Sequence, residues 1–177
     1  IVCPDIKTKT RIDQLKNFGH VGEVNVVATG INGKMSEFNA ALGLLQLKYI
    51  DEAIARRKLI DTAYRNGLHG VQGIQIPGDF GEAVSNYAYF PILVSEDFPL
   101  GRNDLYTALK EFGIHPRRYF YPLISEFPMY RGLPSANREN LPHATQASES
   151  VLCLPIYPDL PTETVAEICN FISNIGK

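Results

Sequence analysis

A long helical pattern from Ser36 to Asn66 constrains the fold of this chain more than any other sequence feature. Apolar residues recur along it at intervals of three or four, which is the spacing of one helix face, and Gly67 follows as a typical C-terminal residue. We therefore expect one helix, about 45 Å long at 1.5 Å per residue, whose apolar stripe is buried against another element. The stripe consists of Phe38, Leu42, Leu45, Tyr49, Ile50, Ile54, Ile60 and Tyr64.

Composition limits the classes of protein that fit this sequence. The chain has 177 residues, of which 45% are hydrophobic, and this is enough for a sizeable core. Its 17 basic and 19 acidic residues nearly balance and form no long run, so charge indicates neither nucleic acid nor an anionic membrane as a partner. No apolar run approaches the roughly 20 residues of a membrane span, and the start lacks a signal-peptide pattern. We expect a cytoplasmic protein.

The cysteines and histidines give no sign of a metal site. Cys3, Cys153 and Cys169 are far apart, odd in number and outside any CxxC spacing, so we expect reduced thiols that behave as small hydrophobic groups. The four histidines do not fall into a metal-ligand or catalytic-triad pattern.

Shorter patterns predict the rest of the organisation. The chain opens on Ile1 without a methionine, and we expect a fragment or a processed product. A second, smaller lobe begins near Gly70, where the texture changes to short elements separated by prolines. The expected elements are a strand at 1–5, a helix before Gly19, strands within 73–78 and 86–94, a helix at 103–112, an extended segment at 114–123, a helix at 144–151, a strand at 151–157 and a helix at 162–175.

The segment GINGKM, residues 30–35, precedes the long helix and has two interpretations. Its glycine spacing fits neither a P-loop nor a GxGxxG dinucleotide motif. The general preference of helix N-termini for anions still permits an anion site here. The alternative is a plain loop in which Ser36 caps the helix.

The segment HPRRYFYP, residues 115–122, combines guanidinium groups with flat aromatic rings. Arg117, Arg118, Tyr119, Phe120 and Tyr121 suit a nucleotide or a sugar phosphate. The alternative is an edge strand whose alternate aromatic side chains pack into the core.

The run GINGKMSEFNAALGLLQLKYIDEAIARRKLI resembles the signature G-x-N-x-(R/K)-M-(S/T)-(E/D)-x-x-A-A-x-G-x-x-Q-L of DegT/DnrJ-type nucleotide-sugar aminotransferases. The resemblance continues in order through IVCPD, RRYFYPL and VLCLPIYPDLPTETVAEICNFI, so it covers essentially the whole chain. It implies an α/β fold, the C-terminal part of an aspartate-aminotransferase-type (fold type I) transferase. Residues 1–67 would be the tail of the large cofactor domain, including a long interdomain helix, and residues 68–177 a small C-terminal α+β domain.

The same resemblance implies a homodimer that uses pyridoxal 5'-phosphate to move an amino group, usually from glutamate, to a keto-sugar nucleotide. The cofactor supplies that chemistry, and the protein orients the reactants. By position, Asn32 would contact the cofactor phosphate of the neighbouring subunit. The expected substrate-binding residues are Lys34, Arg118, Tyr119, Phe120 and Tyr121.

Two departures from the family pattern qualify this expectation. The lysine that binds the cofactor, the aspartate at its pyridine nitrogen and the ring-stacking residue would all lie upstream of Ile1, so this chain alone should not transaminate. Many relatives have His-Tyr-Pro where this chain has Phe120, Tyr121 and Pro122. In this respect the chain resembles the branch of the family that acts on 4-keto-6-deoxy sugar nucleotides. The alternative is a non-catalytic sugar-nucleotide-binding or oligomerisation module. Without the rest of the large domain, the apolar stripe of the long helix would be partly uncovered, and this predicts a dimer or higher oligomer.

Overall fold

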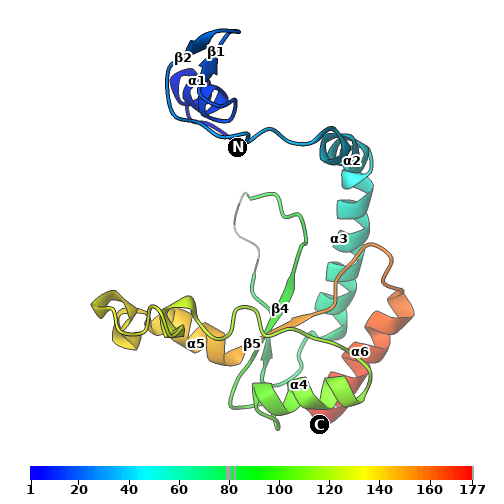
Figure 1. Ribbon diagram of the computed structural model, residues 1–177. Coiled ribbons are helices and arrows are strands. Elements are labelled where there is room, and N and C mark those ends of the chain that lie inside the picture. Colours follow the sequence, from blue (N-terminus) through cyan, green and yellow to red (C-terminus); the bar gives the residue numbers. More distant parts are fainter. Residues whose placement is uncertain (79–80, 82, 177) are drawn as a thin grey trace. The chain divides into compact units, whose positions relative to one another are not determined.

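The computed structural model describes residues 1–78, 81 and 83–176 (Figure 1). The chain divides into two compact units, Ile1–Tyr49 (unit 1) and Ile50–Lys177 (unit 2), and each is described by itself.

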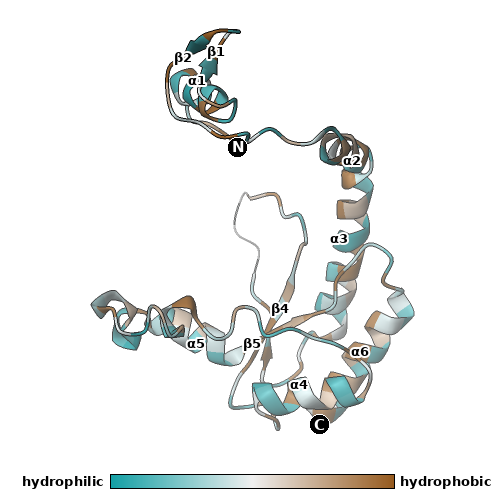
Figure 2. Cartoon of the chain, viewed as in Figure 1, coloured by the Kyte–Doolittle hydropathy of each residue, from teal (hydrophilic) through white to brown (hydrophobic). Residues whose placement is uncertain are grey.

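Unit 1 is built from short elements around a hairpin. Its elements are α1 (Ile6–Leu15), β1 (His20–Val21), β2 (Asn25–Val26) and α2 (Glu37–Leu47). Asp5 caps α1, because its carboxylate accepts a hydrogen bond from the Thr8 amide at 2.7 Å. β1 and β2 pair antiparallel, with His20 opposite Val26. Neither α1 nor α2 has a buried residue, so the apolar residues of α2, brown in Figure 2, lie on its surface.

The single helix expected from Ser36 to Asn66 is wrong, because the structure has two helices, α2 and α3 (Ile50–Gly67), separated by a turn at Lys48 and Tyr49. The Lys48 amide donates to the Leu45 carbonyl, three residues back, which tightens and ends α2. No proline or glycine marks the break. Acidic residues in the first turn of α3 favour a new helix N-terminus there.

Unit 2 is a small sheet covered by helices. β3 (Ile74–Gln75), β4 (Phe90–Val94) and β5 (Val151–Leu154) form an antiparallel sheet in the order β3-β4-β5. The remaining helices are α4 (Arg102–Glu111), three short 3₁₀ helices (Ile124–Glu126, Pro134–Ala136 and Arg138–Asn140), α5 (Pro142–Ser150) and α6 (Thr162–Ile175). The register places Phe90 opposite Leu154 and Ile92 opposite Leu152.

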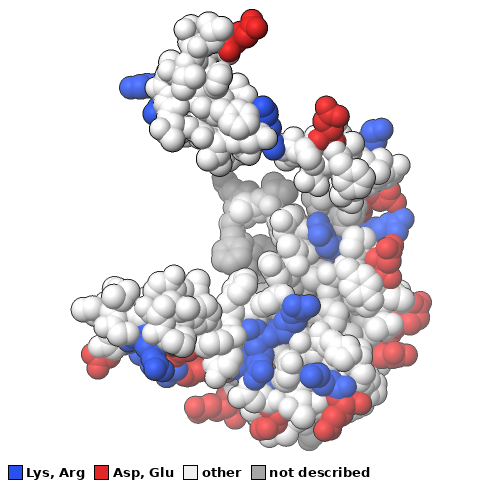
Figure 3. All heavy atoms as spheres, viewed as in Figure 1, with Lys and Arg blue, Asp and Glu red and all other residues white. Residues whose placement is uncertain are grey.

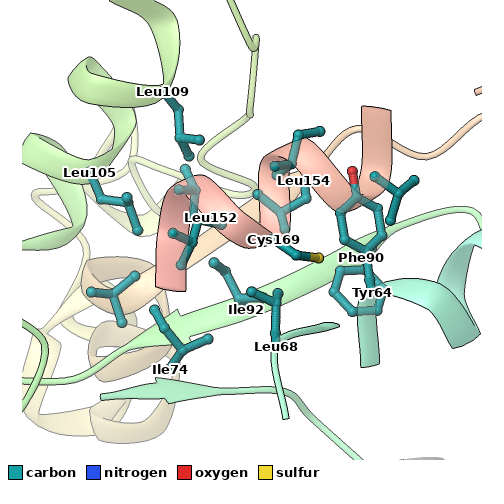
Figure 4. Close-up of a cluster of buried hydrophobic side chains, with 14 of the residues drawn as sticks. Tyr64, Leu68, Ile74, Phe90, Ile92, Leu105, Leu109, Leu152, Leu154 and Cys169 are labelled. Carbon is teal, nitrogen blue, oxygen red and sulfur yellow. The ribbon is translucent and has the colours of Figure 1, made fainter. Parts of the chain in front are cut away.

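The core of unit 2 lies between the sheet and helices α3, α4 and α6 (Figure 4). Phe90, Ile92 and Val94 alternate along β4 and are buried, as the period of two in a strand requires. Tyr64 of α3 stacks on Phe90 with a centroid separation of 4.7 Å, and its hydroxyl donates to the Pro155 carbonyl. This core holds β5, at one edge of the sheet, and the first half of α4 in place. The candidate site lies beside these two elements.

Several sequence expectations are confirmed in unit 2 and one fails in unit 1. The last helix has the expected bounds, 162–175, and Val165, Ile168, Cys169 and Ile172, which recur at helical spacing, are all buried. The strand expected at 1–5 is wrong, because Ile1 and Val2 are fully exposed and no described strand pairs with them. The domain boundary expected at residue 67 stays a prediction, since compact units and the domains of a longer protein need not coincide. Among the described helices, none has both the length and the apolar character required to cross a bilayer.

Candidate functional site

The loop before α2 packs its backbone against the end of α1. The Ile31 amide donates to the Leu15 carbonyl and the Gly33 amide to the Lys16 carbonyl, each at 2.8 Å. These bonds satisfy carbonyls that a helix C-terminus leaves without partners. Consequently, neither amide is available to cradle an anion.

Gly30 is required by this close approach. A Cβ atom there would lie 2.4 Å from both the Leu15 carbonyl oxygen and the Gly19 amide nitrogen, which no larger residue permits. The expected cap is confirmed, since the Ser36 hydroxyl accepts a hydrogen bond from the Asn39 amide. The glycine therefore serves chain packing.

Asn32 and Lys34 are the side chains of this loop that remain for a ligand. Both are exposed. The side-chain amide of Asn32 makes no hydrogen bond with the described residues. In contrast, Lys34 Nζ donates a hydrogen bond to Asn17 Oδ1 at 3.0 Å and lies 5.3 Å from the centroid of the Phe18 ring. The loop thus offers one amide donor and one nearby ammonium group.

A hollow of about 580 Å³ opens in unit 2 beside α4. This volume is within the usual range of small-molecule sites. Its lining consists of Tyr106, Lys110, His115, Pro116, Arg117, Arg118, Tyr119, Phe120, Tyr121, Pro122, Ile124 and Phe127. The structure therefore brings together the four expected substrate residues of unit 2, which run from Arg118 to Tyr121.

Arg118 is held by α4. Its Nη1 donates to Asn103 Oδ1 at 3.0 Å, and its guanidinium carbon lies 4.4 Å from the Tyr106 ring centroid. A guanidinium group has five N–H donors, so a single amide contact leaves most of them for another partner. The guanidinium carbon of Arg118 also lies 5.6 Å from the centroid of the Tyr121 ring.

Three aromatic rings, those of Tyr89, Tyr119 and Phe120, lie together beside Arg117. Tyr119 and Phe120 stack with centroids 5.0 Å apart, and Tyr89 meets Tyr119 edge-on at 5.4 Å. Arg117 Nη1 donates to the Tyr119 hydroxyl at 2.9 Å. Phe120 is 67% exposed, so a flat ligand can reach its side chain.

The segment from Arg117 to Tyr121 is not the edge strand of the alternative interpretation. Only Arg117 forms a bridge, with Cys153 of β5. Phe120 and Tyr121 are exposed and do not pack into the core. The aromatic side chains thus face a ligand-accessible surface.

The hollow is electropositive. Lys110, Arg117 and Arg118 line it, and in the part of the chain that the structure describes no carboxylate lines it or forms an ion pair with them. Figure 3 shows basic side chains gathered over the part of unit 2 where α4 and β5 lie. Unpaired cations beside aromatic rings favour a ligand with negative charge and a flat ring.

Arg102 lies behind the hollow and was not expected from the sequence. It is 6% exposed, and burial, followed by the charge of Arg118, lowers the pKa of its guanidinium. Its guanidinium carbon lies 4.6 Å from the Tyr121 ring. A sequence signal did exist, since a cation in the first turn of a helix opposes the helix dipole.

The described residues contain no cluster of three or more His, Cys, Asp or Glu side chains that could hold a metal ion.

The sequence is similar to a family of known aminotransferases. The model of the DegT/DnrJ/EryC1/StrS aminotransferase family matches residues 1–173. A dTDP-4-amino-4,6-dideoxy-D-glucose transaminase of Escherichia coli is 55% identical over 100% of this chain and 47% of the relative. A protein of the same name from Shigella dysenteriae is 42% identical over 99% of this chain and 47% of the relative. The chain thus spans about half the length of the curated relatives it matches.

Solved structures give the same result for the fold. DesI, solved in the presence of its TDP-sugar product, matches with a TM-score of 0.86 and 30% identity, over 99% of this chain and 44% of DesI. DesV of S. venezuelae matches with a TM-score of 0.89 and 23% identity, over 99% of this chain and 46% of DesV. The fold is therefore that of part of a fold type I aminotransferase.

Proposed function

We propose, from the premise that this chain belongs to the DegT/DnrJ/EryC1/StrS aminotransferase family, that it is the C-terminal part of a sugar aminotransferase. The whole protein would use pyridoxal 5'-phosphate to transfer an amino group, with glutamate as donor, to a keto-sugar nucleotide. The identity of 55% along the entire chain to a dTDP-sugar transaminase supports this reaction class. A dTDP-linked keto sugar is accordingly the substrate to test first.

The hollow of unit 2 is the proposed substrate site. Its unpaired cations and exposed aromatic rings are the observation that carries this proposal. Arg118 would bind the diphosphate, because a guanidinium group makes charge-assisted, bidentate hydrogen bonds to phosphate oxygens. Tyr119, Phe120 and Tyr121 would pack against the base or the sugar.

The loop of unit 1 is the proposed contact for the cofactor phosphate. Asn32 fits this role, because its exposed side-chain amide makes no hydrogen bond with the described residues. Its NH2 group can donate a hydrogen bond to a phosphate oxygen. Lys34 supplies positive charge two residues further on, and we propose that it contacts the substrate. When bound, pyridoxal phosphate supplies the amino-group transfer. Asn32 contributes only to holding the phosphate, and no residue of this chain is proposed to bind the cofactor covalently.

A homodimer completes this proposal. Asn32 would reach the cofactor of the neighbouring subunit, so that each site uses residues of both copies. The exposed apolar residues of α2 support an interface, because large uncovered apolar surfaces mark association sites.

The test uses the gene product that contains this chain. We expect Asn32→Ala to weaken retention of pyridoxal phosphate about tenfold or more, since a lost charge-assisted hydrogen bond costs about 1.5–3 kcal/mol. Cofactor retention is followed by absorbance during dialysis, together with amino transfer from glutamate to a dTDP-keto sugar. Asn39→Ala, another exposed asparagine of unit 1, is the control.

Two results would contradict the proposal. Equal cofactor retention in Asn32→Ala and wild type would show that Asn32 does not bind the cofactor phosphate. A gene product that binds dTDP but never retains the cofactor would instead be a non-catalytic binding module, which is the alternative function.

A further inference from the structure

We propose that three residues of α4, namely Arg102, Asn103 and Tyr106, are positioning residues that hold Tyr121 and Arg118 in the geometry that binds a nucleoside diphosphate. We call these three residues the α4 clamp. This inference rests on the proposed function, because it assigns a mechanism to the substrate hollow of unit 2.

Arg102 occupies a position that is unfavourable for a cation. It is the first residue of α4, where the partial positive charge of the helix N-terminus repels it. It is also buried, and taking a guanidinium group out of water costs several kcal/mol unless the protein compensates. An apolar residue of similar length would avoid both costs, so the charge at this position points to a role beyond packing.

The contacts of Arg102 compensate only part of this cost. Nη1 donates to the Val151 carbonyl at 3.3 Å, and Nε is buried with no hydrogen-bond partner among the described residues. No carboxylate lies within ion-pair distance of it in the described part of the chain. The contact that remains is the Tyr121 ring at 4.6 Å. Arg102 therefore connects the start of β5 and the start of α4 to this ring.

Asn103 and Tyr106 hold the Arg118 side chain, as Arg102 holds the Tyr121 ring. Asn103 Oδ1 accepts a hydrogen bond from Nη1 of Arg118 at 3.0 Å, and the Tyr106 ring lies 4.4 Å from its guanidinium carbon. Residues 102, 103 and 106 lie within the first two turns of α4. Because Leu105 of the same helix is fully buried in the core, the clamp is mounted on a rigid element.

Fixing these two side chains improves ligand binding. An arginine that is free to rotate loses rotamer entropy when it binds a ligand, and a preordered one loses less. The Asn103 contact is to a neutral amide, so the charge of Arg118 stays available to a diphosphate. Tyr121 is 44% exposed, and Arg102 supports its ring without covering it completely. The α4 clamp itself does not contact the reacting atoms.

The test measures dTDP binding to the gene product by titration calorimetry. We expect Arg102→Met and Asn103→Ala each to raise the Kd of dTDP about tenfold. Lys58→Met removes an exposed cation from α3 in the same unit, and we expect it to change the Kd less than twofold. In steady-state assays the two clamp variants should raise the KM for the sugar nucleotide while kcat stays within twofold, because the lost contribution is to binding.

A second readout separates positioning from folding. The protein is labelled with 3-fluorotyrosine, and the ¹⁹F resonance of Tyr121 is assigned as the one missing in Tyr121→Phe. We expect Arg102→Met to shift and broaden this resonance in the absence of ligand, and Arg102→Lys to restore it in part. Asn103→Ala alters an exposed side chain, so it tests the clamp even if Arg102→Met fails to fold.

The outcomes distinguish this inference from the proposed function. If wild type binds dTDP and both clamp variants bind it equally well, the clamp is disproved and the proposed function stands. If Arg102→Met lowers kcat or stability but leaves KM and the Tyr121 resonance unchanged, Arg102 is only structural and the inference is wrong. If wild type does not bind dTDP, the dTDP-linked substrate of the proposed function is wrong, and the inference fails with it.

Discussion

At the scale of single residues, burial controls the chemistry of the cysteines in unit 2. Cys153 and Cys169 are both buried, and burial raises the pKa of both thiols, that of Cys169 to about 11. A raised pKa means that the folded protein favours the neutral thiol. Both cysteines therefore behave as small apolar groups at neutral pH, as the sequence analysis expected.

We predict that Cys169 makes the folded state less stable in alkaline solution. Above the ordinary thiol pKa of 9.0 the unfolded chain loses this proton, whereas the folded chain keeps it until about pH 11. Since the folded state then binds more protons, the free energy of unfolding falls as pH rises from 9 to 11. Urea denaturation at pH 8.5, 9.5 and 10.5 measures this slope.

The matched variant is Cys169→Ala, which removes the thiol. Its free energy of unfolding should fall less steeply over the same pH range than that of wild type. Parallel slopes in the two proteins would show that other groups cause the whole effect.

At the scale of elements, α3 and α6 approach each other where α3 ends. A Cβ atom at Gly67 would lie 2.7 Å from Cys169 Sγ and 2.9 Å from its Cβ. Both distances are shorter than real carbon contacts, and the Cys169 side chain is buried on α6. The glycine therefore permits the close packing of these two helices.

We predict that Gly67→Ala destabilises the protein by about 1–3 kcal/mol, because overpacking a core displaces its neighbours. The higher helix propensity of alanine, up to about 1 kcal/mol, offsets part of this. Chemical denaturation measures this change in the free energy of unfolding. Gly70→Ala is a poor control, because Gly70 has a φ of +75°, which strains any residue with a side chain. Gly132→Ala in unit 2, where a Cβ atom would meet nothing within 4 Å and the backbone has no positive φ, is the suitable control and should not destabilise.

A double-mutant cycle identifies the cause. In a Cys169→Ala background the sulfur is absent, so Gly67→Ala should cost at least 0.5 kcal/mol less than in wild type, within the range seen for contacting residues. Equal costs in both backgrounds would show that the sulfur does not cause the clash, because the Cβ atom of residue 169 is present in both.

Elements with strong local signals could be predicted from the sequence, and those that depend on tertiary contacts could not. The spacing of Val165, Ile168 and Ile172 fixed the buried face of α6. The turn at Lys48 and Tyr49 carries no breaking residue, so the apolar period continued across it. In the site, the motif indicated Arg118 and its aromatic neighbours, but Arg102 and Asn103 belong to a separate helix that only the fold brings to them.

At the scale of the whole molecule, α2 is mostly apolar and yet exposed. Phe38 is 79% exposed, and Leu42, Leu44, Leu45 and Leu47 are each about half exposed or more. A helix normally buries a broad apolar surface of this kind against another element. These side chains are the strongest structural support for the proposed homodimer.

We predict that Leu44→Glu weakens self-association of the gene product, because a carboxylate in an apolar interface must be desolvated without a partner. Sedimentation velocity should show a dimer for wild type and a monomer, or a dimer at least tenfold weaker, for the variant. Leu59→Glu on α3 is the matched control, since Leu44 and Leu59 have similar exposed fractions, 65% and 67%, and it should remain a dimer. A monomeric wild type would contradict the homodimer, and a Leu44→Glu dimer as tight as wild type would place the interface away from α2.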